Sequence, residues 1–557
     1  MEWENCDKIK RSINVDFFGE GCSMEISVLG INGFAPFRAD KAVKEAKLMP
    51  DFFTDLNLDR ILSEMQVRNK EYDLRFLFYS MVDNAQDVRF RQDIYRDMTE
   101  KLQKDCLTDF SKAMRSTRAR VKLWEETVHA AQKSACFLSA VTEYTDAAAA
   151  LYQALSKAQP DSFGLQRLCG YLKTLVDDPK MQLCRETAKA LNEERQQLSF
   201  HLTVTDEKLE IAAGKKQETY FDKLKLLFPE QFEAKGEKAL SDAYYLESPF
   251  AGETRLGYLE TEAIRVYNKL RPEFFEKMAA FEKEYADILH TELYELEEEL
   301  QFYLSFQNIR YEMEKRGCVF CLPKITDDGS FSVTDGYDMA LAWKNMWDGT
   351  KTVANSVEYR AGERFLVVTG PNQGGKTTFA RSMGQLVYFA MLGLPVPARE
   401  AKVPYFSALL THFSAEESVE SGRGKLKEEL IRLGPMMKET RKNCFVILNE
   451  LFTTAATYDA HIMGGRVLRH FGRQDCRGIY VTHISELTKE EGAVSLVAVA
   501  EGESHKKRTY RLERREAEGT GYAADIVERH NLDADSVKLR LQKRLCEAET
   551  QEGQVKE

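Results

Sequence analysis

The feature that most constrains the fold is a long interval without glycine or proline. The 557-residue chain contains 32 glycines and 13 prolines, which would place about nine of them in a stretch as long as residues 51–159. That stretch contains none. Because glycine and proline interrupt nearly every architecture other than long helices, we expect residues 51–159 to form uninterrupted helices.

Length and composition define the broad class of protein. At about 150 residues per domain, the length indicates three to four domains with large buried cores. Hydrophobic residues make up 43% of the chain and charged residues 30%, which excludes a disordered, a collagen-like and a membrane-bundle protein. The net charge of −11 excludes a uniformly basic nucleic-acid coat. It leaves room for a local basic groove.

The apolar runs and the cysteines indicate the cellular compartment of the protein. The amino terminus has no apolar run of signal-peptide length, and no run anywhere reaches the length of a membrane span. The 11 cysteines are scattered and odd in number, unlike a disulfide scaffold. We predict a soluble cytoplasmic protein without membrane contact. The pair Cys318 and Cys321 could have a chemical role, as half of a zinc site or as a redox dithiol. Alternatively, the two side chains could simply be packed in the structure.

The helical half carries two further patterns. Residues 199–212 alternate apolar and polar side chains, which predicts a short strand or hairpin within a clamp-like insertion near 197–260. From Glu273 to Arg316 apolar residues recur mostly every three or four positions without glycine or proline. That segment predicts a single helix about 65 Å long at about 1.5 Å per residue.

From about residue 335 the pattern changes to the alternation of strands and helices that is typical of a parallel sheet. Short apolar runs, each long enough for one buried strand, lie at 364–369, 444–448, 478–482 and 496–500. The fold class is therefore α plus α/β. We expect an N-terminal segment (1–50), a helical core with lever and clamp (51–325), an α/β domain (326–530) and a charged helical tail (531–557).

The strongest chemical motif is a glycine-rich loop between the run at 364–369 and a helical pattern. It fits G-x-x-x-x-G-K-[ST], with the residues Gly370, Pro371, Asn372, Gln373, Gly374, Gly375, Lys376, Thr377 and Thr378. In such a loop backbone N–H groups surround phosphate oxygens. Lys376 would place its charge at the β- and γ-phosphates, and Thr377 would offer its hydroxyl to magnesium.

Two later strand ends carry the other candidate catalytic groups. The run at 444–448 ends in Asn449 and Glu450, where an amide oxygen could accept a hydrogen bond from a magnesium-bound water and a carboxylate could polarise the attacking water. The run at 478–482 leads to His483, which could sense the γ-phosphate or orient water. Ligands of open α/β sheets bind beyond the carboxyl ends of the strands, so these groups are expected to converge.

A serine-glycine turn, Ser421 to Gly424, precedes an amphipathic helical pattern. Such a turn is an anion site because its N–H groups and the helix dipole point outward. It lies between the phosphate loop and the Asn449 strand, where ATPases of the ABC class carry the signature that completes a partner subunit's site. The same four residues could also be an ordinary solvated turn.

Taken together, the ordered motifs resemble the MutS family of DNA mismatch-repair ATPases within the ABC-like class. The matching segments are TGPNQGGKTT, VPA at 396–398, THFSAEESVESGRGKLKEEL, FVILNELFTTAATYDA, VTHISEL, YRL at 510–512 and GYA at 521–523. They lie within about residues 335–530. The helical half more weakly resembles the family's core, lever and clamp.

The resemblance implies a P-loop ATPase that forms a homodimer, binds ATP and Mg²⁺, and grips DNA. It implies that Ser421 acts in trans, that Glu450 is the catalytic base and that His483 is a switch histidine. Asn355 would contact the adenine side of the nucleotide, and Glu429 also matches a family position. Lys376 would act on the phosphates, and Asn449 would reach the metal through water.

Departures from the family pattern qualify this picture. Asn449 stands where the family usually has Asp, which predicts slow magnesium-dependent turnover, and residues 452–457 replace a glycine-rich loop. We also expect no mismatch-reading domain. The resulting prediction is a DNA-repair or recombination ATPase that recognises DNA structure, because we expect no counterpart of the family's mismatch reader.

Several alternatives stay open. The chain could serve a ribosome- or RNA-associated branch of the family, or it could be an ATP-binding scaffold with little hydrolysis. Candidate nucleic-acid contacts are two basic clusters, each of which could equally be a solvated face. They comprise Lys112, Arg115, Arg118, Arg120 and Lys122, and Lys215, Lys216, Lys223 and Lys225.

Overall fold

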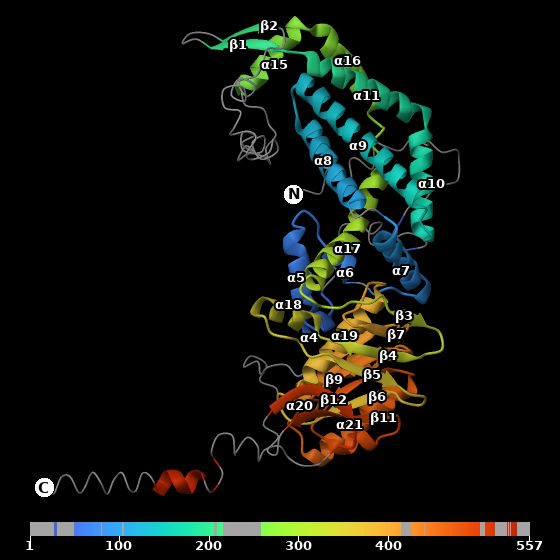
Figure 1. The fold of residues 1–557 in the computed structure, drawn as a ribbon, viewed down its shortest axis with the longest axis vertical. Helices are drawn as coiled ribbons and strands as arrows, with labels where there is room; N and C mark the ends of the chain where they lie inside the picture. Colours follow the sequence, from blue (N-terminus) through green and yellow to red (C-terminus); the bar gives the residue numbers. More distant parts are fainter. Residues whose placement is uncertain are drawn as a thin grey trace, which may run out of the picture. The chain divides into compact units, whose positions relative to one another are not determined.

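The computed structural model divides into two compact units (Figure 1). One unit combines residues 1–28 with 96–300, and the other combines 29–95 with 301–557. The residues that the structure describes are 27–30, 49–79, 81–102, 105–204, 209–214, 258–413, 425–438, 440–501, 507–517, 532, 534 and 536–542. The domain boundaries expected from the sequence stay a prediction.

The described residues of the first unit are helical apart from one hairpin. Its helices are α8 (Cys106–Glu126), α9 (Ala130–Ala158), α10 (Phe163–Asp177), α11 (Pro179–Gln197), α15 (Tyr258–Leu270) and α16 (Pro272–Tyr285). Helix α9 is their common neighbour and packs against the other five. Its side chains fit that central position, because residues from Phe137 to Leu155 on several of its faces are buried. Two further helices, α7 (Ala85–Glu100) and α17 (Thr291–Glu314), contribute residues to both units.

The interval without glycine and proline is helical, as predicted. It contains α7, α8, α9 and three shorter helices, α4 (Asp51–Asp55), α5 (Leu58–Arg68) and α6 (Arg75–Phe78). The prediction that these helices run uninterrupted is wrong. Asn57, in the left-handed conformation with φ 55°, separates α4 from α5, and Gln159, with φ 46°, ends α9. Non-glycine residues therefore make turns that the composition did not reveal.

The predicted hairpin is present. Strands β1 (Phe200–Val204) and β2 (Leu209–Ala213) pair antiparallel, with Leu202 opposite Ile211. Residues 215–257, which include the second basic cluster, lie outside the part of the chain that the structure describes.

The predicted single helix from Glu273 to Arg316 is wrong. Helix α16 ends at Tyr285, and α17 begins at Thr291. The break is stabilised by tertiary contacts: Ile288 and Leu289 are buried, and the backbone N–H of His290 donates to the hydroxyl of Tyr144 at 3.1 Å. The burial of these two aliphatic side chains and the hydrogen bond of this N–H offset the helical hydrogen bonds that are lost at the break.

The second unit contains two sheets. Their strands are β3 (Lys324–Thr326), β4 (Phe331–Gly336), β5 (Asn355–Tyr359), β6 (Phe365–Thr369), β7 (Glu400–Pro404), β8 (Leu409–Phe413), β9 (Phe445–Asn449), β10 (Arg477–Val481), β11 (Ala493–Glu501) and β12 (Lys507–Arg514). The larger sheet has the order β12-β11-β6-β10-β9-β8, parallel except for β12, and the smaller has the order β3-β7-β4-β5. All four apolar runs singled out in the sequence are strands of the larger sheet, so the mixed helical and α/β class is confirmed.

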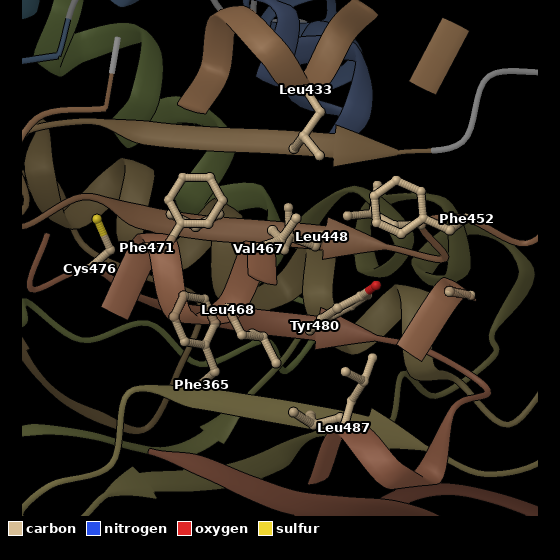
Figure 2. Close-up of a cluster of buried hydrophobic side chains, with 14 of the residues drawn as sticks. Phe365, Leu433, Leu448, Phe452, Val467, Leu468, Phe471, Cys476, Tyr480 and Leu487 are labelled. Atoms are coloured by element: carbon tan, nitrogen blue, oxygen red, sulfur yellow. The ribbon is translucent and has the colours of Figure 1, made fainter. Parts of the chain in front are cut away.

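Side chains of alternating strand residues face opposite sides of the larger sheet. On one side, Val446 and Leu448 join a buried cluster with α20 (Lys425–Lys438) and α21 (Thr457–Arg473), in which Leu433 and Phe471 point toward the strands (Figure 2). On the other side, Ile447 lies against α19 (Lys376–Met391). The central strands are thus covered on both faces, which explains their continuous apolar sequences.

Helix α19 also holds α4 and α18 (Met339–Asp348) in place through one buried side chain. Gln385 donates to the backbone carbonyl of Leu56 at 2.8 Å and to Asp338 at 2.9 Å, and it accepts from the N–H of Met339 at 2.7 Å. Desolvation by burial raises the pKa of Asp338, which also caps α18. The helix that follows the glycine-rich loop is therefore fixed to two neighbouring helices.

The surroundings of Cys318 and Cys321 favour a packing role over metal binding or thiolate chemistry. Cys321 forms a backbone bridge with Val396, and burial raises the pKa of both thiols, that of Cys321 to about 11. Within the described ranges no three histidine, cysteine or acidic side chains are grouped as a metal site requires. No helix in those ranges is long and apolar enough to span a membrane.

Candidate functional site

Three strands of the larger sheet bring the sequence-predicted residues to one edge. Strand β10 lies between β6 and β9, and Val481 is opposite both Val368 of β6 and Asn449 of β9. All three strands are parallel, so the segments that follow them leave the sheet at the same edge. Those segments are the glycine-rich loop, the Glu450 turn and the His483 turn.

The glycine-rich loop has the backbone conformations that its sequence requires. Gly370 and Gly375 have φ of 122° and 88°, where a side chain is strained. A Cβ on Gly370 would also lie 3.0 Å from the Cβ and backbone nitrogen of Ala498. Helix α19 begins directly after the loop, at Lys376, so its N-terminal N–H groups and dipole favour a phosphate there.

Lys376 is buried at the start of this helix. Its ammonium group donates to the backbone carbonyls of Gly370 at 2.9 Å and Pro371 at 3.2 Å. These bonds hold the charge beside the loop that would surround the phosphates. A buried ammonium requires such partners, because desolvating an unpaired charge is costly.

The predicted metal residues are in contact. The hydroxyl of Thr377 donates to the side-chain oxygen of Asn449 at 3.1 Å. A hydroxyl and an amide oxygen are hard ligands that suit Mg²⁺, which usually keeps several waters. The donor set therefore fits the ion, but it supplies no negative charge, because an amide replaces a carboxylate at position 449.

Glu450 and His483 also meet. Nε2 of His483 lies 3.3 Å from Oε1 of Glu450, and both side chains are partly exposed. Glu450 has φ of 54°, and its N–H donates to the carbonyl of Val481 at 2.8 Å. The backbone turn thus directs a carboxylate and an imidazole toward the same space, an arrangement suited to orienting a water for attack.

These groups line a cavity of about 630 Å³. The predicted residues that line it are Asn355, Asn372, Gln373, Gly374, Gly375, Lys376, Thr377, Thr378, Glu450 and His483. Gly370, Pro371 and Asn449 are not in its lining and contribute through Lys376 and Thr377. Ser421 lies outside the described residues, so its predicted role in trans stays a prediction.

Asn355 contacts β12. Its side-chain amide donates to the carbonyl of Tyr510 at 3.1 Å, and its oxygen accepts the N–H of Leu512 at 2.9 Å. The geometry favours positioning of Tyr510, which lines the cavity with a half-exposed ring. An aromatic ring at this edge offers a surface on which a planar base can stack. Direct contact of Asn355 with adenine stays a prediction.

The sequence reasoning missed part of the cavity wall. Tyr510 belongs to the YRL segment, but nothing in that tripeptide indicated a role. The segment between α18 and β5, with Lys351, Thr352 and Val353, also lines the cavity, together with Asn345 of α18. A polar loop after a short helix carries no motif, so only the tertiary structure could identify it.

The basic cluster of α8 is largely engaged within the protein. Arg118 pairs with Glu297 at 2.6 Å, Arg120 with Glu143 at 2.9 Å, and Lys112 with Asp109 at 3.4 Å. Glu297 is fully buried. These contacts favour a structural role for the two arginines over nucleic-acid contact, with Arg118 bound to a buried carboxylate and Arg120 in a partly exposed ion pair.

Comparison with known proteins identifies the region around this cavity. Residues 366–522 match the family MutS domain V. The DNA mismatch repair protein MutS of Clostridium kluyveri is 27% identical over 179 residues, which cover 31% of this chain and 20% of the relative. The DNA mismatch repair protein MSH2 of Saccharomyces cerevisiae is 31% identical over 146 residues, 26% of this chain and 15% of the relative.

A third relative, the MutS protein of Rickettsia rickettsii, is 28% identical over 167 residues, 30% of this chain and 19% of the relative. The chain thus spans no more than about a fifth of the length of these relatives. The match contains the glycine-rich loop, the Asn449–Glu450 strand end and the His483 strand end. The segment that carries these three motifs is therefore similar to domain V of the MutS family of DNA mismatch repair proteins.

Proposed function

We propose that this chain binds ATP with Mg²⁺ in the cavity of about 630 Å³ and hydrolyses the nucleotide slowly. The observation that carries the proposal is the convergence of a phosphate-binding loop, a Thr377–Asn449 oxygen pair and the Glu450–His483 pair at one sheet edge. Bound Mg²⁺ would neutralise charge on the phosphates. Domain V of a mismatch-repair family supports the assignment.

Each side chain has a separate task in this proposal. Lys376 and the N–H groups at the start of α19 bind the phosphates. Glu450 accepts a proton from the attacking water, and His483, 3.3 Å away, orients the carboxylate or the water. Thr377 and Asn449 hold the hydrated ion.

The test of hydrolysis is Glu450→Gln, with Glu486→Gln as a matched control that removes an exposed carboxylate outside the cavity lining. Removing a general base should lower ATP turnover at least about 100-fold and leave the Kd for ATP nearly unchanged. The control should keep wild-type values. Turnover is followed by phosphate release, and Kd by titration with a fluorescent ATP analogue.

A second candidate is an ATP-binding scaffold with little hydrolysis. The neutral Asn449 favours it, because the site lacks the carboxylate that would concentrate Mg²⁺ beside Thr377. Wild-type turnover equal to that of Glu450→Gln would select the scaffold.

We further propose that the chain acts as a homodimeric DNA-binding clamp that recognises DNA structure. The names of the relatives, which are DNA mismatch repair proteins, support the choice of DNA. Competition binding across branched, mismatched and plain duplex DNA and structured RNA, with and without ATP, tests it. Affinity for DNA should fall with salt concentration as counterions are released. Binding to none of the DNA substrates would rule out the clamp. A preference for RNA would favour a ribosome- or RNA-associated function.

A further inference from the structure

The segment that carries the proposed catalytic base is under conformational strain. Glu450 and Phe452, both non-glycine residues, have φ of 54° and 61°. Non-glycine residues are strained in this left-handed region, so they persist only where neighbouring contacts impose the conformation. The contacts around residues 450–452 therefore decide where the Glu450 carboxylate lies.

Two contacts hold the first part of this turn. The N–H of Glu450 donates to the carbonyl of Val481, the last residue of β10. Leu451 and Phe452 are almost completely buried in the core cluster between the sheet and the helices α20 and α21, where Figure 2 shows Phe452 beyond the end of β9. Apolar packing anchors the side chains, but it does not satisfy the buried N–H of Phe452.

That N–H donates to a carboxylate on a different element. Oε2 of Glu429, a buried residue of α20, accepts it at 2.9 Å. A hydrogen bond to a charged acceptor is stronger than one between neutral groups, and leaving a buried donor without an acceptor destabilises the conformation that buries it. Glu429 thus supplies the bond on which the second strained residue of the turn depends.

Helix α20 is itself fixed to the sheet beside this bond. The guanidinium of Arg432 donates to the carbonyl of Phe413 at 3.0 Å, and Nε2 of His412 lies 3.4 Å from the carbonyl of Glu429. Both partners belong to the end of β8, the neighbour of β9. The carboxylate of Glu429 is therefore presented from a fixed support.

We propose that Glu429 is a positioning residue for ATP hydrolysis: its bond to the Phe452 N–H holds the Glu450 turn in the conformation that places the base at the cavity. The claim rests on the proposed function and deepens it, because it assigns to α20 the support of the catalytic carboxylate. Glu429 does not line the cavity, so it acts through the turn and not on the nucleotide.

The test compares Glu429→Leu with the conservative variant Glu429→Gln. Leucine fills the buried space without an acceptor, whereas the glutamine oxygen can still accept the N–H of Phe452. An exposed residue near the end of the same helix, Lys438, provides the control Lys438→Ala. Thermal unfolding of all three variants identifies any global loss of structure.

For Glu429→Leu, kcat for ATP should fall about 100-fold, the effect expected of a misplaced catalytic group, and KM should stay within about twofold. Glu429→Gln should recover most of kcat, and Lys438→Ala should match the wild type. Equal kcat in Glu429→Leu and the wild type would overturn the proposal. A loss in Glu429→Gln as large as that in Glu429→Leu would also overturn it.

A second readout does not need hydrolysis. Hydrogen–deuterium exchange of the peptide containing residues 450–456, measured without nucleotide, should be faster in Glu429→Leu than in Glu429→Gln or the wild type. Unchanged exchange in Glu429→Leu would overturn the positioning role even if the wild type hydrolysed no ATP. Absence of wild-type hydrolysis alone would count against the proposed function, so the two failures are distinguishable.

Discussion

The strand-end cavity and the basic helix α8 both carry side chains whose types predict function, but only the cavity brings them together. At the cavity, Glu450 and His483 follow adjacent parallel strands and meet at 3.3 Å. On α8, Arg118 and Arg120 instead pair with Glu297 and Glu143, which lie 179 and 23 residues away in the chain. Residues placed by a local strand-to-loop turn can be assigned from sequence, whereas residues paired through tertiary contacts cannot.

The largest effect should come from Arg118, because its partner is a fully buried carboxylate. Arg118→Met leaves the buried Glu297 carboxylate with the hydroxyl of Ser111, which donates at 2.7 Å, but without its guanidinium partner, and this should lower the free energy of unfolding by about 3–4 kcal/mol. Urea unfolding followed by far-ultraviolet circular dichroism measures the change.

Arg120→Met is the matched control for that comparison. Arg120 and Glu143 are both partly exposed, so the loss should be below about 1 kcal/mol. Equal stability losses in the two variants would show that the burial of Glu297 does not make the Arg118 ion pair contribute more to stability than the Arg120 ion pair. A large loss of DNA affinity in Arg120→Met at unchanged stability would restore this part of α8 as a nucleic-acid contact.

The next effect concerns His412, which lies at the end of β8. Burial, with a smaller contribution from Arg432, lowers the pKa of His412 to about 4. The unfolded chain, with a pKa of about 6.5, takes up the proton first as the pH falls. The stability contributed by the neutral imidazole is thus complete above pH 6.5 and declines by about 3 kcal/mol toward pH 4.

His412→Gln removes this titration and keeps a side chain that can donate toward the carbonyl of Glu429. The stability advantage of the wild type over the variant should therefore shrink between pH 7 and pH 4. Urea midpoints at several pH values measure the difference. A difference that stays constant across this range would contradict the assignment of the acid sensitivity to His412.

The contrast between local strand-to-loop turns and tertiary contacts also explains how much of the molecule could be predicted from its sequence. The four apolar runs became strands of one sheet, and the glycine-rich loop took the backbone angles that its glycines allow. The break between α16 and α17 was missed because it depends on the hydroxyl of Tyr144, more than 100 residues away in sequence. Tyr510 was missed for a similar reason, since Asn355 fixes the backbone of β12 beside it.

The smallest predicted effect concerns Asn449, which contacts the cavity residue Thr377 and stands where the family pattern usually has Asp. Asn449→Asp introduces a carboxylate beside the hydroxyl of Thr377, which is 3.1 Å from the present amide oxygen. A charged oxygen binds a hydrated Mg²⁺ more tightly than an amide oxygen. We therefore expect about a tenfold gain in Mg²⁺ affinity in the presence of ATP, equivalent to about 1.4 kcal/mol, and faster turnover.

Thermal shift titrations with Mg²⁺ at fixed ATP measure this gain. Repeating them in a Glu450→Gln background separates ion binding from hydrolysis, because the double variant should gain Mg²⁺ affinity without gaining turnover. If Asn449→Asp left Mg²⁺ affinity unchanged, the Thr377–Asn449 pair would not be the metal site. Because strand-end geometry places Asn449 as it places Glu450 and His483, that result would also limit what such geometry allows one to assign from sequence.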